Sequence, residues 1–253
     1  MIEGIIRLGG EIAYELHKIS DNADTIVFLH DSLGCITLWR DFPKRLSEKT
    51  NCNILIYDRL GYGKSGGVLK TSRDHFYMED EADMLNAILS ELSIENPILF
   101  GHSDGGSIAL IFAGKYQKAK AIITVGAHIF VEEITLEGIR VAEQAYQTTN
   151  LKEKLEKYHG DNTEALFHAW TETWQNESFR NWNIEHFLSG IVCPALIIQG
   201  EEDEFGTLKQ VERTVAQICG RAEAFVIPNA KHTPHKEVPD VVLDKCVDFI
   251  KSL

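Results

Sequence analysis

Long apolar runs and positive charge are both scarce in this sequence. None of its 253 residues lies in an apolar run near the ~20 residues that a membrane-spanning helix needs. No basic region followed by an apolar segment opens the chain, so we expect no signal peptide. The 25 Lys and Arg residues face 38 Asp and Glu residues, for a formal net charge of −13. A surface this acidic repels phosphate backbones and anionic lipid, so we expect no nucleic acid and no membrane among the partners.

Cysteine pairs with the spacing of a metal or redox motif are also missing. The chain has five cysteines, an odd number, and most lie in or beside apolar stretches, where reduced buried thiols are common. We therefore expect structural, reduced cysteines, which are typical of a cytoplasmic protein. No dinucleotide fingerprint, phosphate-binding loop or zinc motif occurs either. The sequence thus predicts no metal and no organic cofactor.

What the chain does have is a regular alternation of short apolar runs and helical periodicity. Continuous apolar runs such as Thr25–His30 are typical of strands buried on both faces of a sheet. Gly9 and Gly10 join the first two runs and indicate a hairpin. The sequence therefore predicts an α/β fold: a mostly parallel, eight-stranded sheet with helices on both faces. The expected strands are 2–8, 11–18, 25–30, 53–58, 97–102, 121–125, 193–199 and 224–227, and the expected helices of the core are 38–49, 74–92, 105–116, 206–218 and 236–251.

The alternation stops after the sixth expected strand. From about 130 to 190 the pattern is helical and amphipathic, without a buried strand, and this stretch holds three of the four tryptophans. We therefore predict a core of residues 1–128 and 191–253 and a helical insertion of residues 129–190. The 44% hydrophobic content suffices for one sizeable core.

The segment Gly101–Gly105 is a Gly-x-Ser-x-Gly motif between an expected strand and an expected helix. This is the pattern of a nucleophile elbow, in which the serine occupies a strained turn. Glycine is needed two residues to either side because a side chain there would collide with the neighbouring strand or helix. The motif also occurs in ordinary strand-to-helix turns. Ser103 is therefore a nucleophile only if the chain supplies a base and an acid.

An acidic loop follows the seventh expected strand at its carboxyl end. Catalytic groups gather at these ends in α/β sheets, and the acid of such a site precedes the histidine in the chain. The loop offers Glu201, Glu202, Asp203 and Glu204, although acidic clusters are more often solvated surface. We predict Asp203 as the acid because its distance from the strand end best suits contact with a histidine of the next loop. Glu202 and Glu204 are the alternatives.

Two histidines follow the eighth expected strand. His232 comes first, and Pro234 then begins the terminal helix, because proline suits the first helical position. We predict His232 as the general base that takes the proton of Ser103. His235 is expected to line the pocket or to cap the helix. Ser103, Asp203 and His232 follow one another in the chain in the order of a Ser-Asp-His triad.

Two backbone N–H groups are candidates for binding the oxyanion of the reaction. One belongs to Asp104, directly after the nucleophile, and the other comes from the loop after an early strand. That loop is His30–Gly34, and we choose the N–H of Ser32.

Five segments together resemble the α/β-hydrolase superfamily, and the resemblance covers nearly the whole chain. They are the loop His30–Gly34, the turn Tyr57–Ser65, the elbow, the acidic loop and His232. Within the superfamily, the chain is most similar to the biphenyl-hydrolase-like (valacyclovirase-like) serine hydrolases. The segments that carry this similarity are Ser103–Gly106, 126–131, Glu137–Arg140 and Cys193–Ile197.

This resemblance implies roles for particular residues. Asp104 corresponds to the aspartate that recognises the α-amino group of amino acid esters, although an aspartate near a helix N-terminus also meets the helix dipole favourably. The turn Tyr57–Ser65 is structural in the family, and the insertion corresponds to the cap that shapes the pocket. Two departures are Asp31, where the family often has glycine, and Asp203–Thr207, where many relatives have a small apolar residue and proline after the aspartate.

Substrate-binding candidates come from the elbow, from the loop after the sixth strand and from the insertion. We expect at least half of the aromatic residues of the insertion to form its own core instead. The candidates are Asp104, His128, Phe130, Trp170 and Trp174, with His168, Trp182, Glu132 and Glu133 as further residues of interest.

The sequence thus predicts a serine hydrolase that cleaves a carboxylic ester or a related small acyl compound through an acyl-enzyme, with an amino acid ester as one option. The serine disfavours the dehalogenases and epoxide hydrolases of this fold, which use an aspartate nucleophile. Two alternatives remain: a carbon–carbon bond hydrolase of ring-fission products, and a weakly catalytic receptor for a small ligand. We expect a small-molecule acyl substrate as the partner, and a monomer or homodimer.

Overall fold

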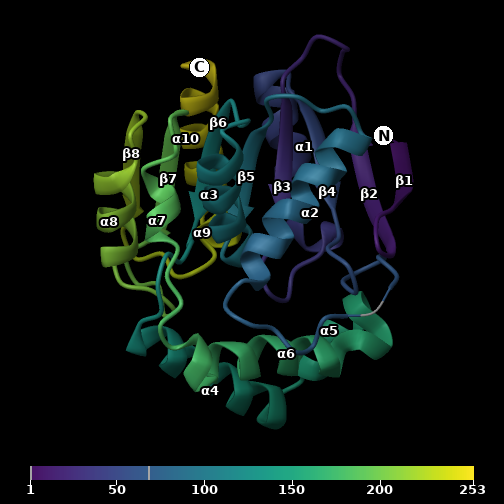
Figure 1. Cartoon of the computed structure of the whole chain (residues 1–253), viewed down its shortest axis with the longest axis vertical. Coiled ribbons are helices and arrows are strands. Elements are labelled where there is room, and N and C mark those ends of the chain that lie inside the picture. The colour runs from purple at the N-terminus through teal and green to yellow at the C-terminus, as the bar shows by residue number, and fades with distance from the viewer. Residues whose placement is uncertain (1, 68) are drawn as a thin grey trace.

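A central sheet of eight strands organises the molecule (Figure 1). The computed structural model describes residues 2–67 and 69–253. The strand order is β1-β2-β4-β3-β5-β6-β7-β8; β2 runs antiparallel to both of its neighbours, and all other pairs are parallel. The predicted α/β fold is confirmed. The strands are β1 (Ile2–Arg7), β2 (Glu11–His17), β3 (Thr25–Leu29), β4 (Asn53–Tyr57), β5 (Ile98–His102), β6 (Ala121–Val125), β7 (Ala195–Gly200) and β8 (Ala222–Ile227).

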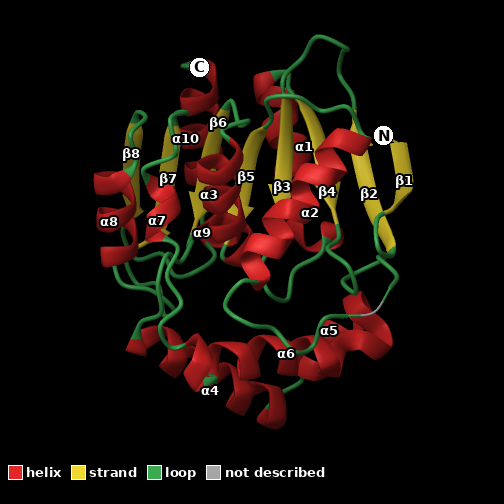
Figure 2. Ribbon diagram, viewed as in Figure 1, coloured by secondary structure: helices red, strands yellow, loops and turns green. Residues whose placement is uncertain are grey.

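Helices cover both faces of the sheet (Figure 2). Apolar residues of α2, α3 and α8 join the cluster on one face, and those of α1 and α10 join the cluster on the other. The helices of this core are α1 (Phe42–Thr50), α2 (Tyr77–Glu91), α3 (Asp104–Tyr116), α8 (Lys209–Gln217), α9 (Pro234–Glu237) and α10 (Pro239–Lys251), and the short α7 (Glu185–Leu188) of the insertion packs beside them.

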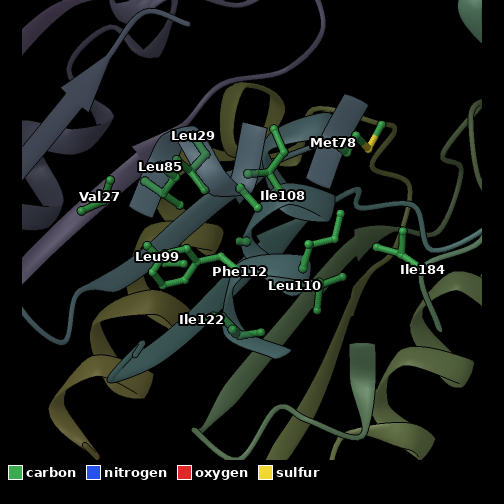
Figure 3. Close-up of a cluster of buried hydrophobic side chains, with 14 of the residues drawn as sticks. Val27, Leu29, Met78, Leu85, Leu99, Ile108, Leu110, Phe112, Ile122 and Ile184 are labelled. Atoms are coloured by element: carbon green, nitrogen blue, oxygen red, sulfur yellow. The ribbon is translucent and has the colours of Figure 1, made fainter. Parts of the chain in front are cut away.

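The larger apolar cluster joins the sheet to α2 and α3. In Figure 3, Val27 and Leu99 of the parallel strands lie in one cluster with Leu85 of α2 and Phe112 of α3. The strands β3 to β6 are buried at almost every position, which explains why they read as continuous apolar runs. Deleting one large side chain from such a core costs about 2–5 kcal/mol. The sheet is therefore a rigid support for the loops at its ends.

Two helices predicted as single elements are divided. The predicted helix 38–49 consists of a 3-10 turn, η1 (Ile36–Trp39), followed by α1, because Arg40 between them has a left-handed φ of 54°. At the C-terminus, α9 begins at Pro234, and α10 begins at Pro239. Val238 separates the two helices with φ −131° and ψ 59°, since the residue before a proline is disfavoured in helical backbone.

The insertion after β6 departs from the layered core. Three of its helices, α4 (Glu133–Thr148), α5 (Leu151–His159) and α6 (Thr163–Gln175), form a separate layer beyond one end of the sheet (Figure 1). All residues of the insertion are described, and its only β-type pairing is one isolated antiparallel bridge between Phe130 and Asn183. The short α7 lies back against α3. Within the described part of the chain, no helix combines the length and apolar character needed to span a membrane.

Aromatic side chains pack inside the insertion. Trp182 stacks on Phe179 with ring centroids 5.4 Å apart, and Trp174 meets both rings edge to face. All three side chains are buried. Trp182 is thus a core residue of the insertion, in line with the expectation that many of these aromatics are structural.

Candidate active site

The elbow places Ser103 between β5 and α3. Ser103 has φ 53° and ψ −120°, a strained conformation for a residue with a side chain. A Cβ on Gly105 would lie 2.0 Å from the carbonyl oxygen of Leu29, and one on Gly101 would lie 2.2 Å from that of Gly105. Both positions therefore require glycine. The motif found in the sequence has the close packing of a nucleophile elbow.

Three side chains from three different loops form a hydrogen-bonded chain at this point. The Nε2 atom of His232 lies 3.0 Å from the Oγ of Ser103. The Nδ1 atom of His232 lies 2.9 Å and 3.0 Å from the two carboxylate oxygens of Asp203. Because a carboxylate only accepts, Nδ1–H donates to Asp203 and the lone pair of Nε2 faces the serine hydroxyl. The structure thus brings together the three residues predicted as nucleophile, base and acid.

The opposite charges of Asp203 and His232 favour the ionised forms of both side chains. Burial alone lowers the pKa of His232, but Asp203 outweighs burial, with help from Asp31 and Glu204, and the net pKa is raised. Burial likewise opposes ionisation of Asp203, but His232 outweighs it and the pKa of Asp203 is lowered. Asp203 therefore stabilises the imidazolium that forms when His232 accepts a proton.

The other acidic candidates lie elsewhere in the loop. Glu201 and Glu202 are exposed. Glu204 accepts a hydrogen bond from the backbone N–H of His232 at 3.2 Å, so its hydrogen bond holds the loop, and it acts on the imidazole ring only through its charge. Asp203 also accepts from the N–H of Phe205 at 2.9 Å, which orients its carboxylate.

His235 lies behind the elbow and not in the cavity. Its ring is buried against Trp39 and His102, with centroids 5.3 Å and 4.5 Å away. Burial lowers the pKa of His235 well below its ordinary value, and His102 adds to this effect. Of the two histidines after β8, only His232 reaches Ser103.

The predicted oxyanion donors come from the start of α3 and from the loop after β3. Asp104 is the first residue of α3, so its N–H has no carbonyl one turn earlier in the helix to bond. Ser32 follows β3 in the loop that approaches the elbow, and it is buried. Both residues line the cavity that contains Ser103.

Asp31, the departure from the family pattern, holds this loop in place. Its Oδ1 accepts the N–H of Leu33 at 2.9 Å, and its Oδ2 lies 3.0 Å from Nδ1 of His102. The Nε2 atom of His102 lies 3.1 Å from the carbonyl oxygen of His232. Asp31 and His102 therefore connect the loop of Ser32, the elbow and the loop of the base.

A cavity of about 180 Å³ opens at Ser103 between the strand ends and the insertion. Among the predicted substrate-binding residues, Asp104, His128, Trp170 and Trp174 line it. Further lining residues, for which the sequence predicted no substrate contact, are Leu33, Thr135, Ile139, Phe205 and Thr233. A larger hollow of about 410 Å³ lies near the end of α2, but its described lining contains no histidine beside its serines.

With this geometry in hand, comparison with known proteins places the chain. The model of the family described as alpha/beta hydrolase fold matches residues 24–183. The chain belongs to this family. Serine hydrolase BPHL of Homo sapiens is 27% identical over 218 residues, which cover 82% of this chain and 72% of the relative. The 2-hydroxy-6-oxononadienedioate/2-hydroxy-6-oxononatrienedioate hydrolase of Paraburkholderia phymatum is 26% identical over 275 aligned positions, which cover 97% of this chain and 93% of the relative.

Solved structures share the fold of this α/β hydrolase. An alpha/beta hydrolase enzyme from a deep-sea metagenome library superposes with a TM-score of 0.79 at 23% identity and covers 98% of this chain and 97% of that chain. The enol-lactonase from Burkholderia xenovorans superposes with a TM-score of 0.75 at 18% identity, covering 96% and 97% of the two chains. These likenesses show the fold, and the resemblance to biphenyl-hydrolase-like enzymes rests on the relatives above.

The side chain of Asp104 is held on one side only. Its Oδ2 accepts a hydrogen bond from the hydroxyl of Tyr77 at 2.9 Å and lies 3.7 Å from the guanidinium of Arg59. Asp104 is buried, and within residues 2–67 and 69–253 its Oδ1 has no hydrogen-bond partner. One carboxylate oxygen on the cavity wall of this hydrolase is thus unpaired. The roles of Arg59 and Tyr77 were not visible in the sequence because both lie far from Asp104 in the chain.

Phe130 does not reach the cavity, contrary to the sequence prediction. Its ring lies under the guanidinium of Arg213, 4.8 Å from the centroid, and its backbone pairs with Asn183. This pairing turns the chain from β6 into the insertion and points the ring away. Neighbouring candidates are structural or exposed: Glu132 binds Thr207 and Gln210, and His168 and Glu133 lie at the surface.

His159 of α5 links the insertion to the core, and no sequence signal marked it. Its Nε2 lies 2.9 Å from the carbonyl oxygen of Leu33, and its Nδ1 accepts the N–H of Gly63 at 3.1 Å. Because the carbonyl only accepts and the N–H only donates, the ring is neutral. Burial lowers the pKa of His159, which fits this state. One residue of the insertion therefore contacts the loop that carries Ser32.

The described residues contain no group of three or more His, Cys, Asp or Glu side chains that could hold a metal ion.

Proposed function

We propose that this hydrolase cleaves a carboxylic ester or a related small acyl compound through Ser103, His232 and Asp203. The observation that supports this proposal is the continuous chain from Ser103 Oγ through His232 to Asp203, at 3.0 Å and 2.9 Å, on the wall of a small cavity. A serine hydroxyl needs such a base to become a useful nucleophile.

Each group has a defined step. His232 takes the hydroxyl proton as Ser103 attacks the carbonyl carbon, and the N–H groups of Ser32 and Asp104 bind the oxyanion. His232 then gives its proton to the leaving alcohol, which departs and leaves the acyl group on Ser103. Water, deprotonated by His232, attacks this acyl-enzyme and releases the acid. One oxyanion donor is worth about 2.7–4 kcal/mol of transition-state stabilisation.

The insertion completes the site in this proposal. We assign residues 1–128 and 191–253 to the catalytic core and residues 129–190 to a cap. Trp170 and Trp174 of α6 and Ile139 of α4 cover the cavity. An apolar cover excludes water and strengthens the electrostatic interactions inside. The small volume suits a short acyl group.

Ser103→Ala provides the test. Removing the nucleophile is expected to lower kcat for p-nitrophenyl butanoate about 10⁶-fold, as triad removal does in another serine hydrolase. A fluorophosphonate should label the parent chain and not Ser103→Ala. The exposed Ser90→Ala is the control and should keep both properties. Turnover that survives in Ser103→Ala contradicts the proposal, whereas labelling without turnover of any acyl compound favours the small-ligand receptor.

Carbon–carbon cleavage is the alternative suggested by the relative from Paraburkholderia phymatum, whose substrate name denotes a dicarboxylate. The described lining of the cavity contains Asp31 and Asp104 and no Lys or Arg, so it is poorly suited to an anionic substrate. We therefore expect neutral esters to be cleaved faster than a 2-hydroxy-6-oxo-dienoate. Cleavage of the dienoate is measured by the loss of its absorbance. The reverse ratio would favour the alternative.

An amino acid ester is a narrower form of the same proposal. The unpaired Oδ1 of buried Asp104 supports it, because an ammonium group would satisfy that oxygen. An α-aminobutanoyl ester should then exceed the butanoyl ester of the same alcohol in kcat/KM by about 10- to 100-fold, the worth of a hydrogen bond to a charged group. Asp104→Asn should remove that preference. Equal rates with the parent enzyme would reject amine recognition while leaving ester hydrolysis intact.

A further inference from the structure

Besides Oδ1 of Asp104, two polar atoms of the cavity lining have no hydrogen-bond partner among the described residues. They are Nδ1 of His128 and Nε1 of Trp174. The two side chains are only 3% and 2% exposed. Buried polar atoms are nearly always paired, because an unpaired one costs about 1–3 kcal/mol. Two such atoms on the wall of a reaction cavity indicate a polar group of the substrate that pairs with them.

The contacts of His128 decide what its free nitrogen can do. Its Nε2 lies 3.0 Å from the carbonyl oxygen of Phe205, which also accepts a hydrogen bond from the Oγ1 of Thr135 at 2.5 Å. A carbonyl cannot donate, so Nε2 carries the proton. Burial lowers the pKa of His128, with His232 adding to the effect, so the ring is neutral near pH 7. Nδ1 is therefore an acceptor with a free lone pair.

Trp174 supplies the opposite function, because the indole Nε1–H can only donate. Its ring stands edge to face against that of His128, with centroids 5.2 Å apart and an interplanar angle of 65°. The ring that carries the acceptor and the ring that carries the donor are thus neighbours in the lining of one cavity, and Thr135, from α4, fixes the carbonyl that orients the histidine.

The chemistry of this pair selects its ligand. A hydroxyl group donates and accepts through a single oxygen, so it can pair with both atoms at once. An ammonium group only donates and would leave the indole N–H unpaired. A carboxylate would oppose the lone pair of His128 and the charge of Asp104, which also lines the cavity. An alkyl group would leave both atoms unpaired.

We propose that His128 and Trp174 form a hydroxyl subsite, and that the preferred substrates are esters of short hydroxy acids. The hydroxyl donates to Nδ1 of His128 and accepts from Nε1–H of Trp174. The proposal rests on hydrolysis by Ser103, and it is separate from amine recognition, which uses Oδ1 of Asp104. A site built to pair with a hydroxyl rejects the analogue that lacks one. We therefore expect kcat/KM for the hydroxyacyl ester to exceed that for the plain acyl ester by about 10- to 100-fold, which is below the largest ratios known for such sites.

Matched acyl groups test this subsite. The benzyl esters of butanoic, 2-hydroxybutanoic, 3-hydroxybutanoic and 2-aminobutanoic acid differ only in one substituent. We expect one of the two hydroxyacyl esters to exceed the butanoyl ester in kcat/KM by about 10- to 100-fold. Trp174→Phe and His128→Leu should each remove most of this ratio. His128→Asn, which retains an acceptor near the position of Nδ1, should restore part of the ratio lost in His128→Leu.

Trp170→Phe is the matched control, because it also removes an indole from the cavity lining, but Trp170 is only partly buried and its nitrogen is not one of the buried unpaired atoms. It should change the rates on all esters alike and preserve the hydroxyacyl preference. Binding to Ser103→Ala, measured by calorimetry with the same esters, should show the same preference without turnover.

The outcomes separate the two proposals. Hydrolysis of the butanoyl and both hydroxyacyl esters at equal kcat/KM, dependent on Ser103, overturns the hydroxyl subsite and leaves the proposed function standing. Failure to cleave any ester or other acyl compound overturns the proposed function, and the calorimetric preference then decides the subsite alone. A preference that persists in both Trp174→Phe and His128→Leu also overturns the subsite.

Discussion

The catalytic residues and the rest of the cavity lining differ in how their polar atoms are partnered. The core wall carries Ser103 and His232, backed by Asp203, and each of these side chains is hydrogen-bonded to the next, whereas Asp104 and His128 of the same wall each have one unpaired polar atom. The insertion wall, with Trp170, Trp174 and Ile139, is mainly apolar, and the indole nitrogen of Trp174 has no partner among the described residues.

This difference separates reaction from selection. The atoms that move protons are complete without a substrate, because a catalytic geometry has to be held in advance. The unpaired atoms of Asp104, His128 and Trp174 are completed only by a bound molecule. Substitutions of the catalytic residues should therefore slow every substrate, whereas substitutions at the unpaired groups, or at a residue that limits the volume of the cavity, should change which substrate is preferred.

The largest effect is expected from Asp203→Asn on the core wall. The amide cannot hold Nδ1–H of His232 as the carboxylate does, so the imidazole loses its tautomer and its stabilising charge. We expect kcat to fall about 10⁴-fold on all esters, as in a comparable triad. Steady-state kinetics on the ester panel measures this. The exposed Glu201→Gln removes the same charge from the same loop and should leave kcat within about twofold, in keeping with the small effects of surface substitutions. An equal loss in both variants would refute the assignment.

A smaller effect is expected at Asp31, which holds the loop of Ser32 on the core wall. Asp31→Ala removes the contacts to Leu33 and His102, so the N–H of Ser32 loses its position, and kcat should fall about 10- to 100-fold with little change in KM; loss of a whole oxyanion donor sets the upper limit. Asp31→Asn should recover most of this loss, because its amide oxygen still accepts from Leu33 and its NH₂ donates to His102. Inhibition by a boronic acid should weaken in parallel with kcat. Equal losses in the two variants would assign the effect to charge instead of position.

The pH profile is the next test of the core wall. His232 must be neutral to accept the serine proton, and Asp203 holds its pKa above the ordinary value of 6.5. Since the imidazolium is inactive, kcat/KM should fall about tenfold for each pH unit below that raised pKa. Without the carboxylate, burial dominates, so the acid limb of Asp203→Asn should move to lower pH. An unchanged midpoint would show that another group controls the limb.

The smallest effect is expected on the insertion wall at Ile139. Ile139→Ala enlarges the cavity where α4 covers it, so the ratio of kcat/KM for hexanoyl over butanoyl esters should rise about tenfold, the lower end of what extra methylenes contribute in a pocket. The deletion should also lower stability by about 2–5 kcal/mol, so a thermal melt must accompany the kinetics. A uniform loss on all chain lengths would mean that this wall contributes to reaction and not only to selection.

Much of the fold and the reacting residues could be predicted from the sequence because their signals are local. Buried strands read as continuous apolar runs, and the elbow needs glycine at two positions where backbones approach closely. Asp203 and His232 could be placed because the carboxyl ends of parallel strands meet at one edge of the sheet. Helix ends were less predictable: the break at Arg40 depends on a backbone angle that no side-chain pattern encodes.

The sequence by itself determined the α/β fold, and it pointed to Ser103, Asp203 and His232 as one set. Only the tertiary structure decided which atoms of the cavity are already paired. It turned Phe130 away through its pairing with Asn183, brought Asp31 to His102, and fixed the proton of His128 through Phe205. The physical reason is that motifs record what neighbouring residues require of the backbone, whereas hydrogen bonding in a cavity depends on the distance and direction of groups that lie far apart in the chain.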